Sequence, residues 1–312
     1  MATVRNHNYY MMKAILSFIV LSVIYALLVL LLPANKETMH MYHLTPEAYH
    51  VLLSALTMPS LTVWLVAFLA YGKLYEYVDL INDSTESIGF ARMARGIKWL
   101  AWSLPLSSIV SLVAFAIMNT SSGCHTIGIV ANNYLTLILP LIGYSLIGSG
   151  GRSLMAQAKL SFSVSDAQSI MLSFIGGGVL YCYLTFRQLS SIRLSSTHNP
   201  YALPVWLVVV SIIIPYLYAW FVGVLAALEI NTYSKRVRGL LYRQPLRLLV
   251  MGLTIVIASS IALQFLGTVV PATGHILLNY HLTFRFLFRA ASGLGFLLIT
   301  LGVLRLKKIE EV

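Results

Sequence analysis

The tetrapeptide Leu16-Ser17-Phe18-Ile19 returns as Leu172-Ser173-Phe174-Ile175, at a distance of 156 residues in a chain of 312. The same offset, kept without gaps, produces further identities between less common residues. These are Tyr25 and Tyr181, Pro59 and Pro215, Trp64 and Trp220, Tyr77 and Tyr233, Gly96 and Gly252, and His125 and His281. Matches of leucine and valine say little in so apolar a chain, whereas shared Pro, Trp, Tyr, Gly and His in one register are informative. The sequence therefore predicts an internal duplication, clear through the third hydrophobic segment of each half and faint in the fourth.

The composition places both halves in a membrane. The chain is 58% hydrophobic and only 10% charged, with a mean hydropathy of +0.82, whereas a typical soluble domain carries about 25% charged residues. Apolar runs of about 20 residues are needed to cross a bilayer as a helix. Eight such runs occur, at about 14–33, 51–71, 98–118, 127–149, 169–187, 204–228, 246–268 and 284–305. The runs are continuous rather than alternating, so they predict helices and not a barrel.

Four runs fall in each half, and an even number brings both halves into the membrane from the same side. The predicted fold is an all-α integral membrane protein with eight transmembrane helices. They form two parallel four-helix repeats, residues 1–156 and 157–312, related by an axis along the membrane normal. Such a duplication predicts that a working site lies at the interface of the halves, as it does in many transporters.

The net charge of +11 predicts topology and not nucleic-acid binding. In the eight-span arrangement, sixteen of the 21 lysines and arginines lie on one side and five on the other. The five are Lys36, Arg187, Arg193, Arg285 and Arg289. Positive charge gathers on the cytoplasmic side of membrane proteins. We therefore expect a multi-pass protein of the cell membrane with both termini in the cytoplasm, whose basic face contacts anionic lipid headgroups.

Polar side chains at the start of the last run predict a binding site for an anion. His281, Arg285 and Arg289 are spaced by four residues and share one stripe of a helix. Intramembrane arginines usually face a bundle interior or a cavity. The corresponding region of the first half holds His125, Asn132 and Asn133. We expect these six residues to line a site for a small anionic or amphiphilic solute. The alternative is that the two arginines snorkel to outer-leaflet phosphates.

A second constellation lies in the basic loops. Glu76, Asp79 and Asp83 occupy one helical face, and the matching stretch of the second half reads Lys235-Arg236-Val237-Arg238. Opposite charges at corresponding places predict pairing between the halves across the pseudo-two-fold axis. The Asp79/Asp83 pair also resembles the first Asp-rich motif of intramembrane prenyltransferases, but the second motif of that family is missing here. A solvated amphipathic helix is the remaining alternative.

The sequence gives no positive sign of an enzyme, a metal or a cofactor, and the short catalytic motifs are absent. No Asp or Glu lies inside an apolar run, so a carboxylate proton relay is not expected. Three functions stay open. The first is transport or permeation of a small anionic or amphiphilic solute. The second is a lipid-binding or sensory membrane module. The third is a redox protein with haem or metal on outer histidines such as His40, His43, His125 and His281. The oligomeric state is not indicated.

Overall fold

The computed structural model describes residues 9–31, 45–120, 125–161, 205–236, 240–269 and 275–310, together with seven isolated positions between 168 and 179. Within the helices, several turns are described by their backbone alone, among them residues 48–59, 114–120, 125–136 and 275–285. The described residues form seven long α-helices and no strand. These are α1 (Tyr9–Leu31), α3 (Pro46–Leu80), α4 (Ser87–Thr120), α5 (His125–Gln157), α7 (Val205–Arg236), α8 (Leu240–Val269) and α9 (His275–Glu310).

The all-helical class expected from the sequence is confirmed for the described residues. Three segments are long and apolar enough to cross a membrane, namely Tyr9–Leu31, Leu241–Ser260 and Phe286–Glu310. The seven helices coincide with seven of the eight apolar runs. The other run, 169–187, falls largely outside the described residues, so the count of eight spans stays a prediction.

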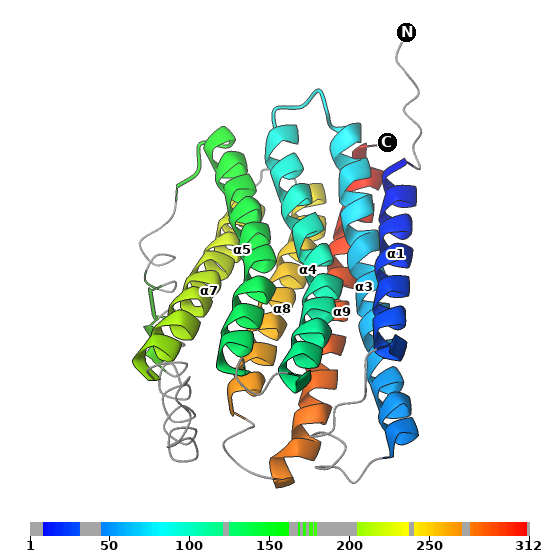
Figure 1. Ribbon diagram of the computed structural model, residues 1–312. Helices are drawn as coiled ribbons and strands as arrows, with labels where there is room; N and C mark the ends of the chain where they lie inside the picture. The colour runs from blue at the N-terminus through cyan, green and yellow to red at the C-terminus, as the bar shows by residue number, and fades with distance from the viewer. Residues whose placement is uncertain are drawn as a thin grey trace.

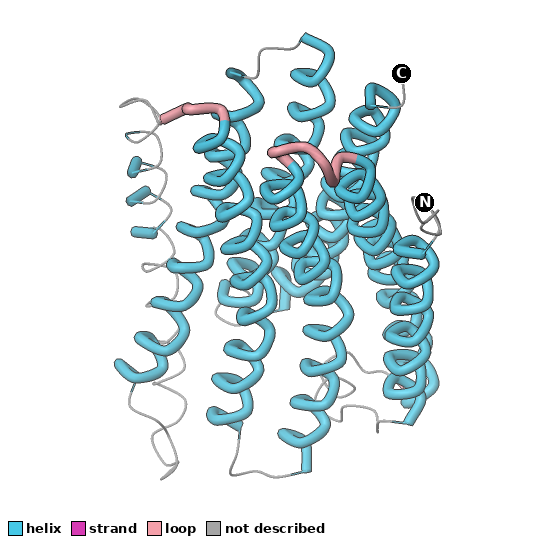
Figure 2. The backbone as a smooth tube through the Cα atoms, turned by 90° about the horizontal axis from the view of Figure 1, so that it is seen from above, coloured by secondary structure: helices cyan, strands magenta, loops and turns pink. Residues whose placement is uncertain are grey.

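The helices run side by side as one bundle (Figures 1 and 2). The turn at residues 81–86, the start of α1 and the ends of α5, α7 and α9 lie at one end, which we call the basic end. Consecutive helices α4 and α5 pack as an antiparallel pair, and α8 and α9 do the same. Helix α3 packs against α9, and α5 packs against α7, in both cases as parallel neighbours far apart in sequence.

Helix α1 packs on α3 through one narrow face. Its buried residues, Ala14, Leu21, Tyr25 and Val29, recur at intervals of seven and four residues, which is one stripe of a helix. The rest of its surface is apolar and exposed, including Leu16 at 60% and Leu30 at 70%. Water disfavours so large an apolar surface, whereas lipid tails accept it. Helix α1 therefore has the pattern of a span that faces lipid on one side.

Glycines bring the backbones of α4 and α5 into direct contact. A Cβ atom on Gly96 would lie 2.6 Å from the carbonyl oxygen of Gly143, and one on Gly150 would lie 2.7 Å from that of Gly89. Real Cβ atoms do not approach other atoms so closely, so only glycine fits at these crossings. Small residues at helix interfaces permit this packing in membranes, where apolar side chains gain little by leaving lipid.

The pair α8 and α9 repeats the same contacts. A Cβ on Gly252 would lie 2.4 Å from the oxygen of Gly295, and one on Gly302 would lie 2.8 Å from that of Pro245. The α8 positions follow their α4 counterparts by 156 residues, as from 96 to 252 and from 89 to 245. The α9 positions follow their α5 counterparts by 152 residues, as from 143 to 295 and from 150 to 302. The correspondence in the fourth helix is thus displaced by four residues, about one helical turn.

Candidate functional site

The two halves of the sequence are interleaved in space. Helix α3 from the first half lies against α9 from the second, and α5 from the first half lies against α7 from the second. Figure 1 shows α3 (blue) beside α9 (red), and α5 (green) beside α7 (yellow-green). The two buried carboxylates that the structure describes, Glu76 and Glu229, belong to these two contacts. Their partners across the contacts are Lys307 and Arg152, and the partly buried Arg289 lies in the first contact.

Arg289 lies in the α3/α9 contact, far from the basic end. Its side chain is partly buried, and Nη1 donates a hydrogen bond of 2.6 Å to Oγ of Ser60 on α3. Ser60 is 4% exposed. One turn farther along each helix, a Cβ on Gly293 would lie 3.2 Å from Cγ2 of Val63. The guanidinium therefore points toward α3 at a place where the two helices approach closely.

Aromatic side chains surround this place. Tyr25 of α1 is close enough to interact electrostatically with the charge of Arg289. The ring of Tyr25 meets that of Trp64 edge to face, with 5.2 Å between centroids. Trp64 follows Ser60 by one turn of α3, and both aromatic residues are buried. The arrangement gives a cation between three helices, next to a hydroxyl and a low-dielectric aromatic wall.

The other residues of the predicted anion site are only partly located. His281 and Arg285 belong to the early turns of α9, and His125, Asn132 and Asn133 to the early turns of α5. Their side chains lie outside what the structure describes. Whether they join Arg289 stays a prediction, and Ser60 and Tyr25 are neighbours that sequence reasoning missed. In sequence, Ser60 could have been found only from its place one helical turn before Trp64, which is repeated as Trp220.

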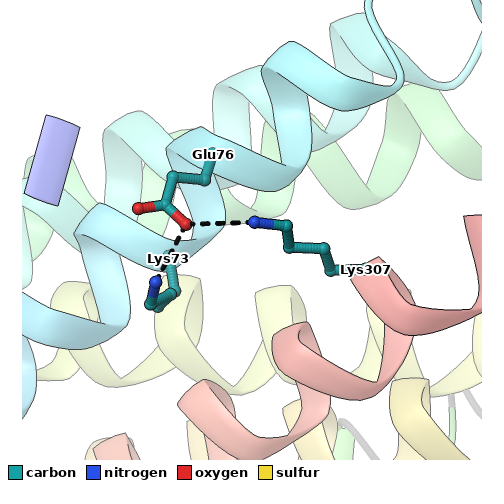
Figure 3. Close-up of polar contacts among 3 residues, drawn as sticks. All are labelled: Lys73, Glu76 and Lys307. Carbon is teal, nitrogen blue, oxygen red and sulfur yellow. Dashed lines mark hydrogen bonds and ion pairs between the residues drawn. The ribbon is translucent and has the colours of Figure 1, made fainter. Parts of the chain in front are cut away.

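At the basic end, Glu76 forms a three-residue cluster (Figure 3). Its Oε2 lies 2.9 Å from Nζ of Lys73, one turn earlier in α3, and 3.5 Å from Nζ of Lys307 on α9. The Glu76 side chain is 3% exposed, and those of Lys73 and Lys307 are 28% and 15% exposed. The Lys307 contact is an ion pair between the halves. One carboxylate thus has two cations.

The α5/α7 contact has a single ion pair at the same end. Arg152 Nη1 lies 3.1 Å from Oε1 of Glu229, whose side chain is 1% exposed, whereas that of Arg152 is 55% exposed. Glu229 directly follows the apolar run 204–228, at the start of the basic stretch. Burial raises the pKa of its carboxyl to about 7, although the charge and hydrogen bond of Arg152 lower it. Loss of water around a carboxylate disfavours its ionised form.

Of the predicted set, Glu76 forms an ion pair between the halves, but with Lys307 of α9 and not with Lys235 or Arg236. Asp79 accepts a 3.5 Å hydrogen bond from the Tyr10 hydroxyl, and the side chain of Asp83 is exposed. Lys235 is exposed, Arg236 donates to the backbone oxygen of Ser161, and Arg238 lies outside the described residues. No ion pair joins the described members of the predicted set. The prediction compared the loops of the two halves, whereas the ion pairs that form between the halves join residues on helices.

No group of three or more His, Cys, Asp and Glu side chains suited to a metal ion occurs in the part of the chain that the structure describes. His40 and His43 lie outside that part, so the histidine hypothesis is not tested by the structure. The known proteins give no further guide to the site. No family model, curated protein or solved structure matches this chain.

Proposed function

We propose that this chain is a multi-pass transporter or permeation protein of the cell membrane for a small anionic or amphiphilic solute. The solute binds between the two halves at Arg289. The observation that carries the proposal is the guanidinium of Arg289, partly buried where α9 of one half meets α3 of the other and hydrogen-bonded to buried Ser60.

The architecture we propose is two parallel four-helix repeats, the first in residues 1–156 and the second in residues 157–312. The matched glycine contacts of α4/α5 and α8/α9 support it, since Gly96 and Gly252, at the predicted offset of 156, meet Gly143 and Gly295, which are 152 residues apart. The interleaving of α3 with α9 and of α5 with α7 is also symmetric. In this architecture each half contributes two helices to the space where a solute would bind.

The basic end faces the cytoplasm in this proposal. Helix α1 begins and α9 ends there (Figure 1), as an even number of spans requires. Lys98, Arg243, Arg247 and Lys308 are further basic residues near that end. They suit anionic headgroups of the inner leaflet, which attract juxtamembrane lysine and arginine. Arg289 then belongs to the outer half of the membrane.

The chemistry of Arg289 selects an anion. Ser60 accepts one hydrogen bond of this guanidinium. A guanidinium has five N–H donors in a planar fork, and that fork matches a carboxylate or phosphate with two parallel bonds. Tyr25 and Trp64 add apolar surface beside the charge, which fits an amphiphilic solute. We therefore place carboxylates and phosphate esters ahead of halide.

Uptake into liposomes tests the proposal with phosphate, a short-chain carboxylate and halide as substrates. Arg289→Ala removes a charge-assisted hydrogen bond, which contributes about 1.5–3 kcal/mol, so apparent affinity should fall about ten- to hundredfold. Arg289→Lys should restore only part of it, because lysine keeps the charge and loses the fork. Arg305→Ala, an exposed arginine on the same helix, is the matched control and should transport normally.

The same experiment separates the second class of function. If wild type moves none of the three anions, or if Arg289→Ala moves them as well as wild type, transport at this site is wrong. Binding of anionic vesicle lipid that weakens in Arg289→Ala would then favour a lipid-binding or sensory module, with Arg289 contacting a headgroup phosphate.

A further inference from the structure

Glu229 differs from every other described carboxylate in how it is surrounded. It is 1% exposed in the α5/α7 contact. Its Oε1 has one hydrogen bond, from Arg152, while Oε2 is buried and receives none from the described residues. A carboxylate has about four acceptor positions. An ionised carboxyl with one satisfied position inside a protein is unfavourable, and it usually recovers the loss by taking up a proton.

Helix α5 packs closely against the side chain of Glu229. A Cβ on Gly148 would lie 3.1 Å from Oε2, and one on Gly151 would lie 3.0 Å from Cβ of Glu229. The two glycines of α5 thus form the surface on which the carboxyl lies. Because both lack side chains, α5 approaches closely enough to exclude water from Oε2. The environment that favours the neutral acid is produced by the contact between the halves.

The surrounding charges complete the description of this environment. Arg152 is the charged group of α5 that faces Glu229, and its 55% exposed side chain reaches toward solvent. Helix α8, which also packs on α7, carries Tyr242, Arg243 and Arg247 in its first turns, and none of them bonds to Glu229. On α7 itself, Tyr233 is buried one turn later, and its pKa is also raised by burial.

We propose that Glu229 is a proton-binding site and that proton binding holds α5 and α7 together at the basic end. The proton comes from water on that side and adds to a carboxylate oxygen, leaving a neutral acid and no other product. The part of the proposal that links this step to solute movement rests on the proposed function. Proton binding itself does not.

The direction of the effect follows from linkage. A Glu229 carboxyl that meets water has an ordinary pKa near 4.5, whereas in the packed arrangement its pKa is about 7. The packed arrangement therefore binds the proton more tightly than an open one. Acidification favours contact between α5 and α7, and a rise of pH through neutrality favours an arrangement in which Glu229 is hydrated. The Arg152 ion pair alone would give the opposite sign, but desolvation is the larger effect here.

A carboxyl that binds and releases a proton can regulate an anion carrier. If the inner face opens when Glu229 loses its proton to the cytoplasm, proton release accompanies release of the solute. The proton is taken from and returned to the same side, so the step lets cytoplasmic pH regulate opening of the inner face and moves no proton across the membrane. A ligand shifts the equilibrium between two arrangements that bind it unequally. Here the ligand is the proton.

The test uses the full chain in nanodiscs without any solute. Spin labels are placed at Ala156→Cys on α5 and Lys235→Cys on α7, two exposed positions at the basic end, with Cys124 and Cys182 replaced by Ser. The label distance should lengthen between about pH 5 and about pH 9, on either side of the neutral range. Glu229→Gln, which copies the neutral acid, should keep the short distance throughout. Glu76→Gln is the matched control, and its label distance should change with pH as in wild type.

Infrared spectroscopy measures the proton directly. Wild type should show the band of a protonated carboxyl that disappears near neutral pH, and Glu229→Gln should lack it. If Glu229→Gln fails to insert, Glu229→Asp serves instead and should move the midpoint. Absence of such a band, or a pH-dependent distance that persists in Glu229→Gln, overturns the proposal. Arg289 has no part in these measurements. Normal results here without anion uptake in liposomes would leave a proton site in a protein that does not transport, and the reverse would leave transport without regulation by pH at Glu229.

Discussion

Glu76 and Glu229 occupy comparable places and have different charge environments. Each is almost fully buried at the basic end, in a contact between a helix of one half and a helix of the other. Glu76 lies between two ammonium groups, whereas Glu229 has one guanidinium partner that is half exposed. The two carboxylates differ in the number of their cations and not in burial. Glu229, with a single half-exposed cation, has a carboxyl pKa that burial raises to about 7, and it can change its protonation.

The α4/α5 and α8/α9 contacts provide the reference for this comparison, because they differ little between the halves. Gly96→Val and Gly252→Val each insert side-chain atoms where even a Cβ would meet a backbone oxygen at 2.6 and 2.4 Å. Backbone cannot move aside as a side chain can. Overpacking costs about 1–3 kcal/mol and sometimes more, and we expect the upper end or failure to assemble in both variants. Thermal unfolding in detergent measures it. Gly176→Val, where no atom of the described residues lies within 4 Å of the Cβ position, is the control. A large loss in one half alone would mean that the two contacts are not equivalent.

Neutralising Glu76 and neutralising Glu229 should have different effects on stability, and these are the next largest that we expect. Glu76→Gln removes the negative charge that lies between Lys73 and Lys307, whose side chains are 28% and 15% exposed. Removing one partner of a buried ion pair costs about 3–5 kcal/mol. We expect about 2–3 kcal/mol here, since both lysines reach some water.

Glu229→Gln should cost little at any pH. Wild type loses stability as pH rises from about 4.5 to about 7, because the folded state holds the proton more tightly, and Glu229→Gln should lack that slope. Unfolding midpoints measured across this range give the answer, and equal losses in the two variants would contradict the distinction drawn here.

The smallest expected effect comes from Lys307→Met. The longer of the two Glu76 contacts, 3.5 Å, is lost, while Lys73 remains at 2.9 Å. Ion pairs with partly exposed cations contribute about 0–1 kcal/mol, so the unfolding midpoint should change little. Lys73→Met should have a larger effect than Lys307→Met, because it removes the shorter contact. If Lys307→Met is as damaging as Glu76→Gln, the contact between the halves matters more than the local one within α3.

Much of the fold could be read from the sequence. Continuous apolar runs and their flanking charges predicted the helices, because burial in lipid imposes one pattern on every span. The pairing of halves across the basic end could also be anticipated, but not its partners. Helix ends were drawn where apolar residues stop, so Glu229, one residue past Leu228, was assigned to a loop. In the structure α7 continues to Arg236. A carboxylate next to a run is then carried into the bundle by the helix that extends beyond it.

The anion site shows the other limit. Arg289 donates a hydrogen bond to Ser60 of α3, and its place in an anion site stays a prediction. In sequence, Ser60 has only the weak signal of its place one turn before the repeated Trp64, because a serine among apolar residues is common in membrane helices. Its importance comes from the crossing of α3 with α9, helices that are 229 residues apart at this contact. Contacts at such distances depend on tertiary packing and cannot be read from local spacing.

The displacement of α9 relative to α5 has a practical consequence. Gly96 and Gly143 are separated by 47 positions along the chain, and Gly252 and Gly295 by 43, yet they make the same backbone contact. The contact therefore does not depend on the number of residues between its two glycines. The stretch between them, beyond the crossing, is where a tag, a fluorescent domain or a shorter turn can be grafted without disturbing the bundle.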